Sequence, residues 1–93
     1  MGTKRVYFLA HGRVQGVFYR KFTANRAQEL NLTGWVRNRS DEKVEGEAQG
    51  DETSVAQLMK DLKKGPTHAL VSKLDVEDRE LVDGESKFEV RRG

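Results

Sequence analysis

The hydrophobic periodicity of this 93-residue chain changes several times between that of strands and that of helices, and the order of the changes restricts the fold. Residues 6–10 are apolar, aromatic and β-branched, which favours a buried strand. Tyr19, Phe22 and Ala27 then recur at helical spacing, and Gly34 closes that pattern. The chain is therefore predicted to begin with a strand followed by a helix.

The middle of the chain predicts a hairpin and then a second helix. Residues 33–38 and 43–49 read as paired strands, the second with small apolar residues on one face and glutamates on the other, so one face of the sheet is expected to meet water. Residues 55–62 carry an apolar stripe at helical spacing, and Gly65 with Pro66 stops it. The candidate N-terminal caps of this second helix are Asp51, Thr53 and Ser54.

Two more strand-like segments complete the pattern, residues 70–76 and 87–91, and Asp83 with Gly84 turns the chain between them. The first six of these elements follow the order βαββαβ, which together with a sheet that is polar on one face predicts the α+β class. The expected fold is a ferredoxin-like α/β sandwich with an antiparallel sheet and two helices on one face. No repeat or linker interrupts the pattern, so residues 1–93 are expected to form a single domain.

The composition removes several kinds of chemistry. The chain has no cysteine, which excludes disulfides, thiolate metal sites and a cysteine nucleophile. No apolar run approaches the roughly 20 residues of a membrane helix, and the first residues lead directly into a strand. We therefore expect a cytoplasmic protein with no membrane partner. Glu45 and Glu47 lie along one strand face and are interpreted as solvated, so no metal site is expected.

The connection between the first strand and the first helix suits an anion. Gly12 and Gly16 allow left-handed or crowded backbone conformations, and the start of a helix adds unpaired N–H groups. Arg20 lies in the first helical turn, where a cation is unfavourable by roughly 0.3–1 kcal/mol unless an anion is bound there. Two glycines at this spacing also fit an ordinary connection, since no Walker lysine follows and the dinucleotide fingerprint is incomplete.

Residues 12–20, GRVQGVFYR, and residues 34–38, GWVRN, resemble the two signatures of the acylphosphatases, small enzymes that hydrolyse the carboxyl–phosphate bond of acyl phosphates. Both motifs stand in the expected order in a chain of the right size, so the resemblance covers nearly all of it. It implies a small-molecule acyl phosphate substrate, and no metal or other cofactor.

The resemblance also implies residue roles. In the family, the arginine that matches Arg20 binds the substrate phosphate, and the asparagine that matches Asn38 orients the attacking water, whose proton goes to a phosphate oxygen of the substrate. The residues expected to bind the phosphate are Gly12, Arg13, Val14, Gln15, Gly16, Val17 and Arg20. The expected catalytic residues are Arg20 and Asn38.

Both catalytic candidates also have an ordinary structural interpretation. Arg20 fits a solvated helix residue, and Asn38 fits the start of a turn. The functional roles are chemically reasonable because a guanidinium can bind two phosphate oxygens, while an amide can accept from a water and donate to a phosphate oxygen. For the two to meet, the strand with Ala10 and the strand with Asn38 are expected to lie side by side, with the loop and the hairpin turn at the same end.

Three further positions bear on this hypothesis. The family usually has glycine after the hairpin aspartate, where this chain has Glu42 after Asp41, so the turn is expected to be looser or of another type. His11 stands beside the loop and would suit a phosphoenzyme, but no acidic partner is evident near it in the sequence. Tyr19 is expected to place its ring in the core with its hydroxyl at an edge.

Two alternatives from other functional classes remain. A small RNA-binding module shares the βαββαβ order, but residues 43–49 lack the aromatic residues on which bases stack, and no nucleic-acid partner is expected. A non-catalytic anion-binding regulatory domain would keep the phosphate loop without turnover. The oligomeric state expected for the enzyme is a monomer.

Overall fold

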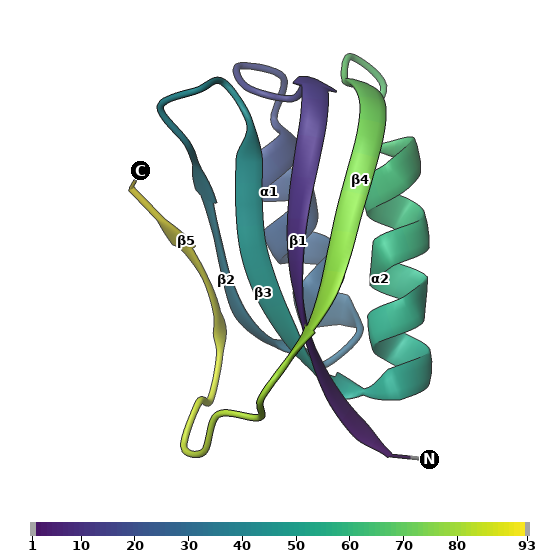
Figure 1. The fold of residues 1–93 in the computed structure, drawn as a ribbon, viewed down its shortest axis with the longest axis vertical. Helices are drawn as coiled ribbons and strands as arrows, with labels where there is room; N and C mark the ends of the chain where they lie inside the picture. Colours follow the sequence, from purple (N-terminus) through teal and green to yellow (C-terminus); the bar gives the residue numbers. More distant parts are fainter. Residues whose placement is uncertain (1, 93) are drawn as a thin grey trace.

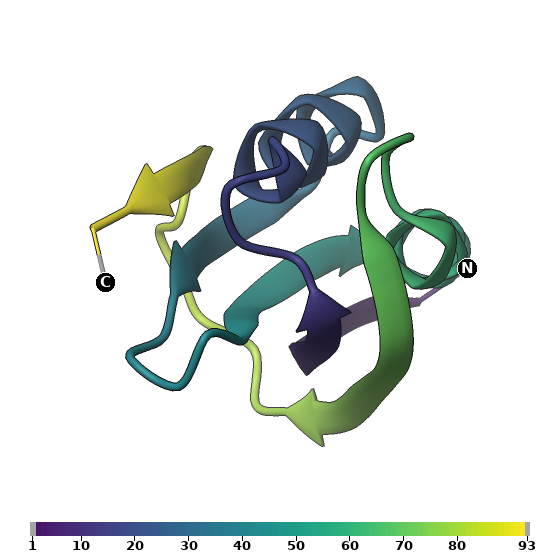
Figure 2. The same cartoon turned by 90° about the horizontal axis from the view of Figure 1, so that it is seen from above.

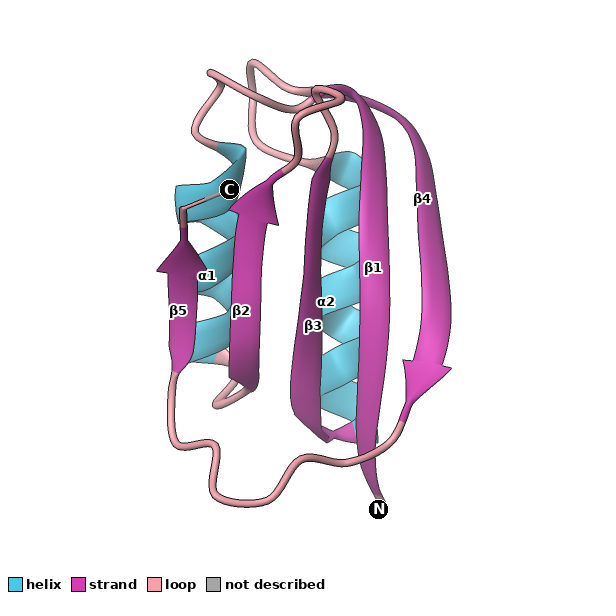
Figure 3. Ribbon diagram, turned by 60° about the vertical axis from the view of Figure 1, so that its left-hand side comes forward, coloured by secondary structure: helices cyan, strands magenta, loops and turns pink. Residues whose placement is uncertain are grey.

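A computed structural model describes residues 2–92 as a five-stranded sheet with two helices on one of its faces (Figures 1 and 2). The two helices lie behind the sheet in Figure 3, and the other face of the sheet is uncovered by helices. The elements in chain order are β1 (Thr3–Arg13), α1 (Tyr19–Glu29), β2 (Thr33–Asn38), β3 (Val44–Asp51), α2 (Glu52–Lys64), β4 (Leu70–Arg79) and β5 (Phe88–Arg91). The predicted ferredoxin-like α/β sandwich is confirmed.

The strands follow the order β4-β1-β3-β2-β5, and β4, β1, β3 and β2 pair antiparallel as predicted. The fifth strand differs from the prediction, because β5 pairs parallel to β2 and makes the sheet mixed. β4 and β5 lie at opposite edges, and residues 80–87 carry the chain from one edge to the other along the lower end of the sheet in Figure 3. After that crossing, β5 enters the sheet from the same end as β2.

The register places one residue from each of three strands in one row. Val44 of β3 pairs with Ala10 of β1 on one side and with Asn38 of β2 on the other. The expectation that β1 and β2 are neighbours is therefore wrong, since β3 lies between them. With strands about 4.8 Å apart, Ala10 and Asn38 are separated by roughly two strand spacings. The expected common end of the sheet is nevertheless found, because all three residues share the row.

The two helices begin in different ways. Asp51, one of the three candidate caps, caps α2 by accepting a hydrogen bond from the Thr53 N–H at 3.1 Å. α1 begins after Phe18, which has the left-handed φ of 62° and supplies no capping side chain. The N-terminus of α2 is thus capped by a side chain, whereas the N-terminus of α1 has no side-chain cap.

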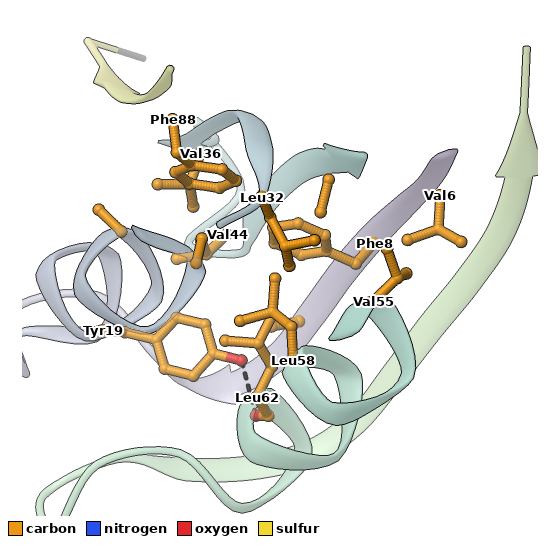
Figure 4. Close-up of a cluster of buried hydrophobic side chains, with 14 of the residues drawn as sticks. Val6, Phe8, Tyr19, Leu32, Val36, Val44, Val55, Leu58, Leu62 and Phe88 are labelled. Atoms are coloured by element: carbon orange, nitrogen blue, oxygen red, sulfur yellow. Dashed lines mark hydrogen bonds between the residues drawn. The ribbon is translucent and has the colours of Figure 1, made fainter. Parts of the chain in front are cut away.

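The core lies between the helices and the sheet and is closed by apolar side chains from both layers (Figure 4). Phe8, Leu58 and Leu62 are fully buried. The Tyr19 ring is also buried, as expected, and its hydroxyl donates to the Leu62 carbonyl oxygen at 2.7 Å. Burial raises the pKa of this hydroxyl far above its usual value. This hydrogen bond joins the first turn of α1 to the end of α2, so it fixes where α1 begins.

Candidate functional site

The loop between β1 and α1 presents free backbone donors. Among the residues that the structure describes, no hydrogen bond uses the N–H groups of residues 15–18. The loop contains two left-handed residues, Gly16 with a φ of 70° and Phe18 with a φ of 62°. Successive N–H groups in such a bent segment form a concave surface that suits an anion. The loop backbone therefore has the unpaired donors and the bends that an anion site needs.

The first turn of α1 adds positive charge beside these donors. It contains no acidic residue, and it includes Arg20 and Lys21. Within residues 2–92, Arg20 makes no side-chain hydrogen bond and no ion pair, although it is half-buried. A half-buried cation near the positive end of a helix dipole is unfavourable unless an anion accompanies it. The local charge is therefore complementary to a phosphate.

Asn38 carries a second unsatisfied group. Its side-chain oxygen Oδ1 is buried and has no hydrogen-bond partner among the described residues. Leaving a buried acceptor without a partner costs about 1–3 kcal/mol. Asn38 is the last residue of β2, so the strand holds its side chain in place while the hairpin turn begins beyond it. Native proteins keep few such groups, so each one needs an explanation.

A single pocket of about 570 Å³ brings these features together. Four of the predicted site residues line it, namely Val14, Gly16, Arg20 and Asn38. The remaining lining residues are Phe18, Tyr19, Lys21, Ala24, Asn25, Gln28 and Val90. None of the pocket's lining residues is acidic.

Sequence reasoning missed several of these lining residues. Ala24 and Gln28 follow Arg20 at intervals of four, so helical spacing alone would have placed them on the same face of α1. Val90 carries no comparable signal. It reaches the pocket only because β5 pairs with β2, opposite Val36.

Four predicted phosphate-binding residues do not line the pocket: Gly12, Arg13, Gln15 and Val17. Gly12 and Arg13 belong to β1, which is longer than the predicted strand and pairs with β4 at Val71 and Leu70. Gly12 is needed there for a different reason, since a Cβ at its φ of 115° would lie 2.1 Å from the Leu70 carbonyl oxygen. This glycine permits close strand pairing. The Gln15 side chain instead donates hydrogen bonds to the backbone of the β2–β3 hairpin.

The hairpin turn shows how the chain manages without the usual glycine. Glu42 has a φ of 69°, a left-handed conformation that costs a non-glycine residue about 1–2 kcal/mol. The turn is closed by the Arg39 N–H, which donates to the Lys43 carbonyl oxygen at 2.8 Å. The turn is therefore closed rather than loose, and Glu42, which stands where the family usually has glycine, is strained.

The expectation that Glu45 and Glu47 are solvated is wrong for Glu45, which is buried, while Glu47 is half-buried. Glu45 is 7% exposed and accepts hydrogen bonds from the Tyr7 hydroxyl and the Arg37 Nε, both at 2.7 Å. Burial would raise the pKa of Glu45, but the hydrogen bonds from Tyr7 and Arg37 outweigh it and lower that pKa. Glu47 accepts from the Arg5 Nε at 2.6 Å. Cross-strand arginines, which the alternation of a single strand does not reveal, pair with both carboxylates.

His11 has the acidic partner that the sequence did not show. Its Nε2 lies 2.8 Å from Oδ2 of Asp75 on β4, and the hydrogen bond from His11 lowers the pKa of Asp75. His11 does not line the pocket, so the pair joins two strands rather than facing a substrate. Asp75 is 64 residues away in the chain, which is why its proximity could not be inferred.

Among residues 2–92, no group of three or more histidine, aspartate or glutamate side chains is arranged to hold a metal ion. The helices in this range are also too short or too polar to span a membrane.

The fold and the pocket define the class first: a ferredoxin-like sandwich with a pocket that has basic but no acidic lining residues. The acylphosphatase family model matches residues 6–90. An acylphosphatase of Methylococcus capsulatus is 47% identical over 96% of this chain and 97% of its own length. The chain belongs to the acylphosphatase family and is a hydrolase of acyl phosphates.

Solved structures agree with this assignment. The acylphosphatase of Coxiella burnetii superposes with a TM-score of 0.89 at 39% identity, covering 96% of this chain and 93% of the other. The acylphosphatase of Bacillus subtilis gives a TM-score of 0.90 at 30% identity, covering 97% and 99%. The similarity therefore extends over nearly all of each chain.

Proposed function

We propose that this enzyme hydrolyses acyl phosphates without a metal ion, with Arg20 and the loop N–H groups binding the phosphoryl group and Asn38 orienting the attacking water. The observation that carries the proposal is the shared pocket. It brings together a cation and a buried amide oxygen that both lack partners in the described part of the chain.

Arg20 supplies the directional part of phosphate binding. Its guanidinium donates two parallel N–H bonds to two phosphate oxygens, which the Lys21 ammonium cannot reproduce with the same geometry. The N–H groups of residues 15–18 take up further oxygen lone pairs. The same donors stabilise the charge on the transferring phosphoryl group, and this electrostatic stabilisation is the largest contribution expected in phosphoryl transfer.

The proposed cradle is narrower than the set of residues expected from the sequence. We assign phosphate contacts to the N–H groups of residues 15–18 and to Arg20. Val14 lines the pocket but its side chain is buried in the core, and Gly12 and Arg13 lie in β1. Arg13 is exposed near the loop and contributes to the local positive potential rather than to a direct contact.

Asn38 acts on the water. Its amide oxygen accepts one hydrogen of the water, while its NH₂ donates to a phosphate oxygen, so that the water oxygen faces phosphorus opposite the leaving carboxylate. The water attacks phosphorus, the bond to the carboxylate oxygen breaks, and the proton passes to a phosphate oxygen. The products are a carboxylate and inorganic phosphate, and no side-chain base is required.

The decisive experiment is hydrolysis of benzoyl phosphate in the presence of EDTA. Turnover that is unchanged by the chelator supports the proposal, and turnover only with added metal would reject it. Phosphate binding without turnover would favour the regulatory domain. A salt-dependent shift with single-stranded RNA, without turnover, would favour the RNA-binding module.

We also propose that the enzyme is a monomer in the cytoplasm. Light scattering after size-exclusion chromatography tests the monomer, and fractionation of the source cells tests the location.

A further inference from the structure

The side chain of Gln15 connects the phosphate loop to the β2–β3 hairpin. Its Nε2 donates to the Arg39 carbonyl oxygen at 2.8 Å and to the Lys43 carbonyl oxygen at 2.9 Å. One amide nitrogen thus uses both of its hydrogens on backbone acceptors that are 24 and 28 residues away in the chain. Arg39 directly follows Asn38, so the connection reaches the residue next to the proposed water-orienting amide.

The two acceptors form the base of the hairpin turn. The Lys43 carbonyl oxygen also accepts from the Arg39 N–H at 2.8 Å, which is the hydrogen bond that closes the turn. The Gln15 amide therefore joins an existing hydrogen-bonded unit rather than a mobile side chain. Because β2 ends at Asn38, the position of this unit sets the position of Asn38.

The loop has few other attachments. Gly16, Val17 and Phe18 have no polar side-chain atoms, and in the described part of the chain the N–H groups of residues 15–18 are unpaired. The loop is anchored by the buried Val14 at its start, by Val17, which packs against the core, and by Tyr19 at its end. Between these anchors, the Gln15 amide is the hydrogen-bonded link that fixes the loop relative to the hairpin.

We infer that Gln15 is a positioning residue, which holds the phosphate-binding loop at the separation from Asn38 that in-line attack by water requires. This inference rests on the roles proposed for Arg20 and Asn38. The Gln15 side chain touches neither substrate nor water. It acts through geometry, and a misplacement of about 1 Å between reacting groups can cost on the order of 100-fold in rate.

Two substitutions of Gln15 should affect its hydrogen bonds to the hairpin differently. Gln15→Met keeps the length of the side chain and removes both donors. Gln15→Glu keeps the shape but, when ionised, places an acceptor against two carbonyl oxygens, which is worse than no bond. When protonated, the glutamic acid regains one donor. The loss of activity in Gln15→Glu is therefore expected to diminish as the pH falls, relative to the unmutated enzyme at each pH.

The kinetic test compares kcat with phosphate affinity. For Gln15→Met we expect kcat for benzoyl phosphate to fall about 10–100-fold, while inhibition by inorganic phosphate changes less than threefold, because the loop keeps its own geometry. The matched control is Gln57→Met on α2, which removes a side-chain hydrogen bond to Asp61 far from the loop and is expected to leave kcat unchanged. An equal loss of phosphate affinity and kcat, or no loss of either, would overturn the inference.

A double-mutant cycle tests the route through Asn38. If Gln15 serves to place the loop relative to the water held by Asn38, Gln15→Met should cost little in an Asn38→Ala background. Full additivity of the two losses would contradict this.

An NMR titration with inorganic phosphate separates this inference from the proposed function. In the unmutated protein, phosphate is expected to shift the backbone amide signals of both Gly16 and Asn38. In Gln15→Met it should shift Gly16 but no longer Asn38. This result would support the positioning role even if no acyl phosphate were hydrolysed, and an unchanged shift at Asn38 would refute it even in an active enzyme.

Discussion

Replacing Arg20 should make the protein more stable without phosphate and less stable with it. In Arg20→Gln the side chain loses its charge while much of its stem remains. The cation lies in the first turn of α1, where no acidic residue offsets the helix dipole and no partner pairs with it among residues 2–92. Its removal should therefore raise the free energy of unfolding by about 0.3–1 kcal/mol at low salt.

With phosphate bound, the unmutated protein should be more stable than Arg20→Gln. At a concentration of about 100 times its Kd, a ligand stabilises the protein that binds it by about 2.7 kcal/mol. For a domain of this size, each kcal/mol corresponds to about 4–8 °C in Tm. The unmutated protein should therefore gain about 10–20 °C, and Arg20→Gln should gain far less. Without phosphate, the variant should melt about 1–8 °C higher.

The assay is thermal unfolding at low ionic strength with increasing inorganic phosphate. Lys63→Gln is the matched control, because it removes one positive charge from the last turn of α2, the end where a cation is favourable. This control should lower Tm slightly and leave the response to phosphate intact. If phosphate stabilised Arg20→Gln as much as the unmutated protein, the pairing of Arg20 with the bound anion would be refuted.

Three further predictions concern the hairpin and the uncovered face of the sheet. Asn38→Ala should lower kcat about 10–100-fold and leave the Kd for phosphate within threefold of the original. Its free energy of unfolding should not fall, because a buried oxygen without a partner is removed. A variant with the original kcat would show that Asn38 does not orient the water. Glu42→Gly should raise the urea midpoint by the equivalent of about 0.5–1 kcal/mol. The reason is that relief of the strain at the left-handed Glu42 outweighs the greater conformational entropy that glycine gives the unfolded chain. A lower midpoint would mean that the turn is unstrained. The pKa of Glu45 is lower in the folded protein than its usual value of 4.5, so ionised Glu45 stabilises the fold. This contribution is complete at pH values above 4.5 and is lost as the pH falls through the folded-state pKa. Urea midpoints between pH 6 and pH 3 should therefore fall less steeply for Glu45→Gln than for the unmutated protein, while the exposed Glu80→Gln should follow the unmutated curve.

The local elements were largely predictable. The hairpin strand at residues 33–38 has the predicted bounds, and Asp51 caps the second helix as one of three candidates. These features depend on residues within a few positions of each other. The extent of β1 was not predictable in the same way, because Gly12 is typical of a loop in isolation and becomes a strand residue only through its pairing with β4.

The site was predictable in part. Arg20 and Asn38 could be singled out from two motifs, and the structure places them in one pocket. The neighbours that complete the pocket depend on strand order, since Val90 reaches it through β5. The partners of Glu45 and His11 lie on other strands, and no periodicity along a single strand can identify them.

By itself, the sequence determined the order of elements, the open start of α1 with its arginine, and the two motifs that identify the family. These are properties of short segments, where hydrophobic spacing and residue type act directly on the local backbone. Only the tertiary structure decided that β3 separates β1 from β2, that Asn38 keeps a buried oxygen without a partner, and that Gln15 spans the distance between loop and hairpin. Each of these depends on contacts between residues far apart in the chain, which form only when the sheet has assembled.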